Sequence, residues 1–156
     1  GLMNGTSAST FSPDAAMTRA MMVTILWRME KEPAALKSNF TDLTADWYRT
    51  AVDWAAETGV VNGVGNGKFA PSATLSLEQL ITILYRYAEN KGYNVSKSAS
   101  LDSFTDGSAV SAYAKPAMQW AVGMNFLSGN TLTPGAPANR AQIAQVLMLF
   151  CKAYIK

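Results

Sequence analysis

The 156-residue sequence contains no histidine and only one cysteine. The absence of histidine excludes the commonest general base, the Ser-His and Cys-His nucleophile pairs, and most zinc sites. The single Cys151 cannot form an internal disulfide or a cysteine metal cluster. Its neighbours Leu149, Phe150 and Tyr154 predict a buried thiol in a C-terminal helix, which favours packing over reactivity. We therefore expect no metal ion and no cofactor.

Charge and long apolar runs are also scarce. Charged residues make up 15% of the chain, whereas about 25% is average for globular proteins. The net charge is only +2 and no basic run is present, so nucleic acid is not an expected partner. No apolar stretch approaches the ~20 residues that span a membrane, so we expect no membrane insertion. At 49% apolar residues, the chain is expected to form one globular domain or one compact array of repeats.

What the sequence does contain is a series of three motifs that occurs three times. The first motif is a turn, at 1–5, 59–63 and 125–129. The second is Phe-Ser-Pro, Phe-Ala-Pro or Leu-Thr-Pro, at 11–13, 69–71 and 132–134. The third is a tetrad, at 18–21, 76–79 and 139–142. The prolines of the second motif lie 58 and 63 residues apart, so one supersecondary unit is used repeatedly.

Each tetrad is predicted to begin a helix. Ser76 with Gln79, and Asn139 with Gln142, form capping boxes, whereas Thr18 caps alone because Met21 fills the reciprocal position. Apolar residues then recur at i, i+3, i+4 and i+7 in all three copies. These positions are 22, 25, 26 and 29, then 80, 83, 84 and 87, then 143, 146, 147 and 150.

A further helix is predicted before the turn in the second and third copies. In the second copy Asp46 is the expected N-cap and Gly59 the expected end. One face of this helix holds Trp47, Ala51, Trp54 and Ala55. The third copy has Tyr113, Ala117, Trp120 and Ala121 at the same spacing, with Pro116 early in the helix. The first copy has no such helix, because the chain begins at the turn.

The predicted fold class is therefore all-α, built from tandem helix–loop–helix repeats. The expected organisation is a partial repeat followed by two complete ones, at 1–32, 40–92 and 104–156. The segments 33–39 and 93–103 read as linkers between them.

The second tetrad position is the most unusual chemically. It holds Arg19, Leu77 and Arg140. An arginine at the start of a helix opposes the helix dipole, so its presence twice suggests a function. One interpretation is that the guanidinium and the free N–H groups bind a carboxylate or a phosphate. The other is that Arg19 and Arg140 pair with Asp42 or Asp106 to fix the junction between repeats. The spacing leaves both open.

The remaining candidates are aromatic and acidic. Trp54 and Trp120 are expected in the core, whereas Trp47 and Tyr113 lie at helix starts beside polar loops and could stack on a sugar. Asp42 and Asp106 could form the acid–base pair of a glycoside hydrolase. Because they occupy equivalent positions of different copies, we expect them instead to cap the following helix. An enzyme is therefore not expected.

Taken together, these motifs resemble the S-layer homology family, and the resemblance covers nearly the whole chain. The family's repeat runs Phe-x-Asp, Trp-Tyr-x-x-Ala-Val, a Gly-to-Gly turn, Phe-x-Pro and a Thr-Arg-Ala-Glu or Thr-Arg-Ala-Gln tetrad. Here these are Phe40-Thr-Asp42, Trp47-Tyr48-x-x-Ala51-Val52, 59–63, 69–71 and the three tetrads. The resemblance implies a pseudo-threefold helical spindle.

The resemblance also implies a non-catalytic function outside the cell. Family members anchor secreted proteins to secondary cell-wall polysaccharide, often pyruvylated, at the surface of Gram-positive bacteria, in grooves between adjacent repeats. Arg19 and Arg140 match the family's ligand-contacting arginine. Other expected carbohydrate-binding residues are Asp42, Asp106, Trp47, Tyr113, Gly63 and Gly65.

Three departures from the family pattern limit what it implies. Leu77 replaces the arginine of the second tetrad, so a groove built there should have lost or altered ligand binding. Met21 replaces the acidic or amide residue of the first tetrad. The missing first helix should leave apolar surface exposed, which predicts self-association, an inserted partner segment or a longer chain upstream. The alternative function is a structural assembly module of a surface layer that has lost sugar binding.

Overall fold

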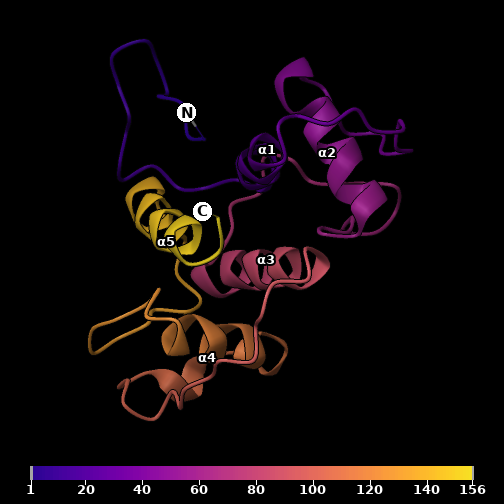
Figure 1. Ribbon diagram of the computed structural model, residues 1–156. Coiled ribbons are helices and arrows are strands. Elements are labelled where there is room, and N and C mark those ends of the chain that lie inside the picture. The colour runs from indigo at the N-terminus through magenta and orange to yellow at the C-terminus, as the bar shows by residue number, and fades with distance from the viewer. Residues whose placement is uncertain (1, 156) are drawn as a thin grey trace. The chain divides into compact units, whose positions relative to one another are not determined.

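The computed structural model describes residues 2–155, and their secondary structure is helical (Figure 1). The α-helices are α1 (Arg19–Met29), α2 (Asp46–Thr58), α3 (Leu77–Asn90), α4 (Lys115–Gly123) and α5 (Arg140–Tyr154). Two short 3₁₀ turns, η1 (Gly107–Ala109) and η2 (Ala112–Ala114), precede α4. Residues 2–155 contain isolated β-bridges but no strand, which confirms the all-α class. None of these helices is long and apolar enough to cross a membrane.

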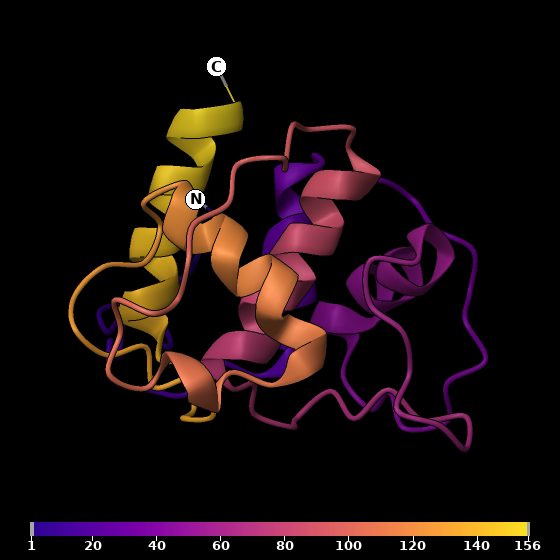
Figure 2. The same cartoon turned by 90° about the horizontal axis from the view of Figure 1, so that it is seen from below.

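The contacts divide the chain into two compact units. Unit 1 combines the residues up to Ser12 with Met17–Thr74, and unit 2 combines Pro13–Ala16 with the residues from Leu75 onward. Within unit 1, α1 packs against α2. Within unit 2, α3 packs against α4, and the two lie side by side in Figures 1 and 2. Each pair therefore joins the second helix of one copy to the first helix of the next.

The helices that follow the tetrads begin as predicted. The Thr18 hydroxyl accepts from the Met21 N–H at 3.2 Å. Both capping boxes are present, with Ser76 paired to Gln79 and Asn139 paired to Gln142. These side chains satisfy N–H groups that the first turn of a helix cannot pair internally.

The first turn of each of these helices is also held by the backbone of another copy. Its first two N–H groups donate to two carbonyls of a Pro-containing loop, at 2.9–3.0 Å. The pairs are Arg19 with Ala73 and Ala20 with Pro71; Leu77 with Ala136 and Glu78 with Pro134; Arg140 with Ala15 and Ala141 with Pro13. The first copy is thus bound to the second, the second to the third, and the third to the first. Because these bonds join main-chain atoms, they form whichever side chain occupies the second tetrad position.

The start of α2 differs from the prediction. Asp46 is the first helical residue and not the N-cap, which is Ala45 and makes no side-chain cap. The Tyr48 side chain supplies only the reciprocal half of a capping box, because its hydroxyl accepts from the N–H groups of Thr44 and Ala45 at 3.1 and 3.3 Å. The predicted end is confirmed, since Gly59 has a φ of 73° that favours glycine.

The equivalent helix of the third copy is shorter than predicted. It begins at Lys115, and Tyr113 lies in the preceding 3₁₀ turn η2. Pro116 is the second residue of α4 and has no N–H, so it cannot make the α-helical bond back to Ala112. The chain instead closes a tighter turn, in which the Ala114 N–H donates to the Ser111 carbonyl.

The predicted core tryptophans are buried, and one predicted face needs correction. Trp54 is buried in unit 1, and in unit 2 the buried Trp120 makes ring contacts with Tyr85, Phe126 and Phe150. Trp47, however, does not share the buried face of Ala51, Trp54 and Ala55; Tyr48 is buried there in its stead. Large rings mostly pack where other groups cover them, and Trp47 is 54% exposed.

The single thiol is less enclosed than predicted. Cys151 lies in α5 as expected, but it is half-buried and not fully buried. Burial raises the pKa of the Cys151 thiol. Because the thiolate is the reactive form, this shift disfavours reactivity, in line with the packing interpretation.

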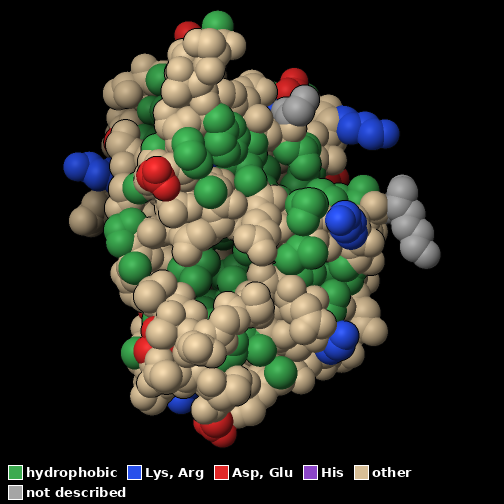
Figure 3. Space-filling model, turned by 90° about the vertical axis from the view of Figure 1, so that its left-hand side faces the viewer, with side chains coloured by type: hydrophobic (Ala, Val, Ile, Leu, Met, Phe, Trp, Pro, Cys, Tyr) green, Lys and Arg blue, Asp and Glu red, His purple; other side chains and the backbone are tan. Residues whose placement is uncertain are grey.

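One face of α5 is uncovered. The residues of α1 and α3 that correspond to this face are mostly buried, among them Val23 and Thr24 of α1 and Ile81 and Thr82 of α3. On α5 the matching residues Ala144 and Gln145 are half-buried and exposed, and Met148 is 49% exposed. Part of the α5 surface is therefore apolar and exposed, unlike the matching surfaces of α1 and α3. Figure 3 shows the side of the molecule that lies on the left in Figure 1, and hydrophobic side chains reach the surface there.

Candidate functional site

Arg19 is fixed against the loop of the second copy in unit 1. Its Nε donates to the Phe69 carbonyl at 2.9 Å, and its Nη2 donates to the Asn62 carbonyl at 2.7 Å. The guanidinium carbon lies 4.7 Å from the centre of the Phe69 ring. These contacts fix the orientation of the guanidinium. They use both its N–H donors and its flat face, which a lysine side chain does not offer.

The charge of Arg19 is only partly balanced. Burial lowers the pKa of Arg19, and the nearby Asp42 carboxylate offsets part of that effect. The guanidinium stays protonated at neutral pH, as arginine does in proteins generally. It carries five N–H donors, and the two loop carbonyls use only two of them. Arg19 can therefore hold the loop and still bind an anion.

The two candidate aspartates do not cap the helices that follow them. This differs from the prediction. Asp42 accepts from the N–H groups of Phe69 and Ala70 at 2.9 and 2.8 Å. In unit 2, Asp106 accepts from Leu132 and Thr133 at 2.8 and 2.7 Å. The capping interpretation is wrong because each carboxylate is used to fold the loop of its own copy, about 27 residues further along the chain.

The loop residue held by each aspartate is conformationally strained. The middle residue of the Phe-x-Pro motif has a positive φ in all three copies: Ser12 at 52°, Ala70 at 58° and Thr133 at 47°. This left-handed region costs an L-residue energy, so its recurrence shows that the loop enforces it. In the first copy the hydroxyls of Thr6 and Ser12 are hydrogen-bonded at 2.6 Å.

Both carboxyl groups are poor proton donors. Burial raises the pKa of Asp42, but the N–H groups of Phe69 and Ala70 and the charge of Lys68 outweigh it, so its pKa is below the ordinary value. The N–H groups of Leu132 and Thr133 likewise hold the pKa of Asp106 below its ordinary value. A general acid needs a raised pKa, so these groups do not suit glycoside hydrolysis.

The two candidate stacking residues are exposed. Trp47 is 54% exposed and Tyr113 is 55% exposed. The Trp47 ring meets the Tyr48 ring edge-on, with their centroids 5.0 Å apart. Arg19 and Asp42 hold the same loop residue, because the Phe69 carbonyl accepts from Arg19 and the Phe69 N–H donates to Asp42.

Tyr113 lies in unit 2. Burial raises the pKa of Tyr113, and the charge of Glu78 and a hydrogen bond from the Tyr113 hydroxyl to Glu78 add to the increase. Glu78 is itself buried and also accepts from the Ser111 N–H and hydroxyl. The hydroxyl of Tyr113 is therefore held by the third tetrad residue of the second copy, and its ring remains exposed.

The two candidate glycines have structural roles. A Cβ at Gly63 would lie 2.6 Å from Cε1 of Phe40 and 2.8 Å from the Lys68 carbonyl oxygen, so a larger residue does not fit. Gly65 has a φ of 101°, which only glycine adopts readily. Both features shape the loop that contacts Arg19; their contact with a ligand stays a prediction.

Arg140 is more enclosed than Arg19. It is 5% exposed, whereas Arg19 is half-buried. Its N–H donates to Ala15, in the same way that the N–H of Arg19 donates to Ala73. Arg140 therefore repeats the backbone role of Arg19, and its guanidinium has less access to a ligand.

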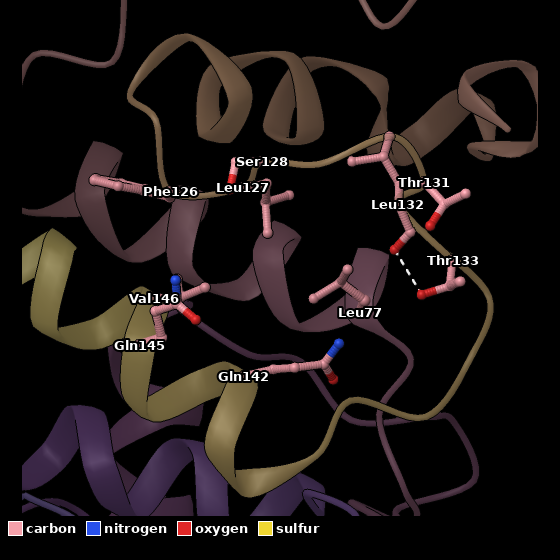
Figure 4. Close-up of a pocket in the computed structure, with 10 residues that line it drawn as sticks. All are labelled: Leu77, Phe126, Leu127, Ser128, Thr131, Leu132, Thr133, Gln142, Gln145 and Val146. Carbon is pink, nitrogen blue, oxygen red and sulfur yellow. Dashed lines mark hydrogen bonds between the residues drawn. The ribbon is translucent and has the colours of Figure 1, made fainter. Parts of the chain in front are cut away.

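A pocket that the sequence did not predict lies beside Leu77 in unit 2. It has a volume of about 260 Å³ and lies between the start of α3, the loop before α5, and α5 itself (Figure 4). The Leu132 carbonyl, which corresponds to the Phe69 carbonyl, accepts from the Thr133 hydroxyl at 2.8 Å. At this one carbonyl, a hydroxyl of the third copy's own loop replaces the Arg19 Nε that donates to the second loop. Comparing the loops position by position, beyond the tetrads, would have revealed this change.

Comparison with known proteins identifies the repeats. The sequence model of the S-layer homology domain matches residues 1–21, 39–81 and 103–144. The chain is 32% identical over 153 residues to an endoglucanase of Bacillus sp. (strain KSM-635) and 30% identical over 153 residues to the surface-layer 125 kDa protein of Lysinibacillus sphaericus. It is also 32% identical over 92 residues to a cell surface protein of Thermoanaerobacter kivui.

The first two relatives are much longer than the matched region. Each alignment covers 94% of this chain but only 16% of the endoglucanase and 13% of the surface-layer protein. The third covers 54% of this chain and 12% of the relative. What these proteins share with this chain is therefore a small module, found both in an enzyme and in a surface-layer protein.

Proposed function

Because the chain belongs to the S-layer homology domain family, we propose that it is a non-catalytic module that anchors a larger protein by binding secondary cell-wall polysaccharide. It acts at the cell surface, where S-layer proteins are found. The occurrence of the same module in an endoglucanase and in a surface-layer protein supports an anchoring role that is independent of the protein it carries.

The observation that carries this proposal is the fixed guanidinium of Arg19. Two carbonyls and the Phe69 ring hold it in place before any ligand binds, so little side-chain entropy is lost on binding. The pyruvyl ketal of a cell-wall sugar carries one carboxylate, and arginine binds carboxylates through paired N–H donors. We therefore propose an acidic, pyruvylated sugar as the ligand of the Arg19 site.

The other candidate residues of the second copy fit a carbohydrate. Trp47 offers an exposed aromatic face for the apolar side of a sugar ring. Asp42 keeps the loop of the second copy folded and carries a charge that can accept from sugar hydroxyls. Gly63 and Gly65 have no side chains, so this loop leaves room for a ligand beside them. In this proposal Asp106 and Tyr113 correspond to Asp42 and Trp47 in the third copy, whose loop faces Leu77, and Arg140 corresponds to Arg19 at the loop of the first copy.

We also propose that the partial repeat at 1–32 and the complete repeats at 40–92 and 104–156 form a pseudo-threefold spindle. The support is the three equivalent pairs of backbone hydrogen bonds, which run from the first copy to the second, from the second to the third and from the third to the first. Three β-bridges recur at matching positions as well: Thr18 with Thr74, Ser76 with Pro137, and Asn139 with Ala16.

An assembly module without sugar binding is the second candidate. The replacement of arginine by Leu77 favours it, because one tetrad has lost the anion-binding group. The uncovered face of α5, with Met148 exposed, would be the surface through which copies associate.

Co-sedimentation with purified cell-wall sacculi separates the two. We expect the wild-type chain to sediment with the sacculi, and mild acid removal of pyruvate to reduce binding at least tenfold. The Arg19→Ala, Arg140→Ala double variant should lose binding to the same extent. Lys37→Ala is the control, since it removes one exposed positive charge from unit 1.

The outcomes are distinct. Binding to sacculi that is unchanged by removal of pyruvate and by the double arginine variant would contradict recognition of a carboxylate. A chain that never sediments with sacculi but self-associates in sedimentation velocity would support the assembly module. Thermal unfolding of every variant shows whether a loss of binding reflects a loss of fold.

A further inference from the structure

The pocket beside Leu77 has lost both cations of the corresponding region of the second copy. Leu77 stands where the first tetrad has Arg19, and Thr131 stands where the second loop has Lys68. None of the ten residues that line the pocket is ionisable. The substitutions are in register, so the change alters the chemistry of one site and leaves the loop geometry intact.

The loop geometry is indeed retained. Asp106 accepts from Leu132 and Thr133 as Asp42 does from Phe69 and Ala70. Thr133 has nearly the same positive φ as Ala70, 47° against 58°. A site that had simply decayed would not be expected to keep a strained loop.

The lining of the pocket has two parts. Leu77, Phe126, Leu132 and Val146 are buried and form an apolar floor. The polar part consists of side chains that reach solvent, namely Ser128, Thr131, Thr133, Gln142 and Gln145. In Figure 4, Leu77 of α3 and Leu127 of the loop before α5 point toward the middle of the cavity. Gln142 of α5 lies below them in this view.

The polar groups suit an amide. The Oε1 atom of Gln142 accepts from the Asn139 N–H at 3.0 Å, so the Nε2 end is the one that can face a ligand. Gln145 adds a second carboxamide, and Ser128 and Thr131 add hydroxyls that both donate and accept. An acetamido group presents one N–H, one carbonyl and one methyl, which matches a polar rim above an apolar floor.

An anion does not suit the pocket. Taking a carboxylate out of water without a cation is costly, and the pocket supplies none. The Asp106 carboxylate, 2.7 Å from the N–H of the lining residue Thr133, would also repel it. A volume of about 260 Å³ lies just below the ~300–1,000 Å³ of drug-sized sites, so it suits one sugar ring.

We propose that this pocket binds one uncharged N-acetylated sugar residue, so that the chain carries a neutral subsite in addition to the acidic one at Arg19. The inference rests on the proposed function, because it assumes that the natural ligand is a cell-wall glycan. In this proposal the leucine at position 77 changes which sugar the site binds and does not abolish binding.

Methyl-resolved NMR titration tests the proposal with three monosaccharide probes. N-acetylglucosamine should shift the methyl signals of Leu77, Leu127, Leu132 and Val146 in a saturable way. Glucose, which lacks the acetamido group, should bind at least fivefold more weakly. N-acetylneuraminic acid, which has the acetamido group and a carboxylate, should also bind at least fivefold more weakly. Equal shifts with all three probes, or no shift with N-acetylglucosamine, would overturn the proposal.

Two variants locate the site. Leu77→Arg should fill the pocket and lower the affinity for N-acetylglucosamine at least tenfold, whereas Leu36→Arg places the same charge on an exposed residue of unit 1 and should have no effect. Thr131→Lys changes an exposed residue and should shift the preference toward N-acetylneuraminic acid. If Leu77→Arg does not fold, Thr131→Lys alone decides, and an unchanged preference contradicts the proposal.

The sacculus assay keeps this inference separate from the proposed function. Sedimentation that depends on Arg19, without any response of the pocket methyls to N-acetylglucosamine, would overturn the neutral subsite and leave the anchoring function intact. If the pocket binds N-acetylglucosamine but the chain does not sediment with sacculi, the anchoring function is contradicted. The neutral subsite is then contradicted as well, because it assumes a cell-wall glycan as the natural ligand.

Discussion

The Asp42 carboxylate holds Ala70 in a left-handed backbone conformation. Its Oδ2 accepts from the Ala70 N–H at 2.8 Å, and Ala70 has a φ of 58°. The same carboxylate binds the Phe69 N–H, and the Phe69 carbonyl accepts from Arg19. One acidic residue thus shapes the loop on which the guanidinium rests, so the candidate ligand site depends on the fold of this loop.

Asp42→Asn should destabilise the chain. The amide keeps the size of the side chain but loses its charge and one of its two acceptor oxygens, which should cost about 1 kcal/mol because the site is near the surface. For a chain of this length we expect the midpoint of thermal unfolding to fall by about 2–4 °C. Asp102→Asn, at an exposed position, is the control and should leave the midpoint unchanged.

Acid should weaken the fold through the same carboxylates. The pKa values of Asp42 and Asp106 are lowered in the folded chain, so their contribution is present above the unfolded value of about 3.9 and is lost as the pH falls below it. The midpoint of unfolding should drop between pH 5 and pH 3. The drop should be smaller in the Asp42→Asn, Asp106→Asn double variant; an identical drop would mean that other groups cause it.

Ala70→Gly should stabilise the loop. Glycine adopts a positive φ without the steric cost that alanine has there, although it gains freedom in the unfolded chain. We expect a net gain of about 0.5 kcal/mol, measured by urea unfolding. Ala73→Gly is the control, since Ala73 is exposed and is not among the positive-φ residues; it should lose about 0.5 kcal/mol.

Trp47→Ala should affect binding without affecting stability. Trp47 is 54% exposed, so its loss should leave the unfolding midpoint within about 1 °C of wild type while reducing binding to sacculi at least fivefold. The buried Trp54 provides the contrast, because Trp54→Ala should cost about 3–5 kcal/mol. Wild-type binding by a folded Trp47→Ala variant would rule out sugar stacking at this position.

The sequence predicted the helices that follow the tetrads better than those that precede the turns. Ser76 with Gln79 and Asn139 with Gln142 are local signals, and both capping boxes are present. The start of α2 depends on the Tyr48 hydroxyl, and that of α4 on the backbone limits of Pro116, which apolar spacing alone does not encode.

The sequence points to Arg19 and Asp42 as candidates but does not reveal what they contact. Arg19 was identified because an arginine at a helix start breaks a local rule, and the structure shows that it donates to Phe69 and Asn62. Asp42 binds the loop because of a fold-back of 27–28 residues, which no nearby sequence signal reveals. The pocket beside Leu77 needed three separate segments to be placed in space before it could be seen.

The hydrogen bonds between helix starts and loops have a consequence for how such modules diversify. Since the junctions are made by main-chain atoms, the residue at the second tetrad position can change from arginine to leucine without loss of the N–H that holds it. Arg19, Leu77 and Arg140 all donate through the same backbone group. Under the proposed function, the copies can therefore differ in the sugar that they bind while the backbone bonds between them stay the same.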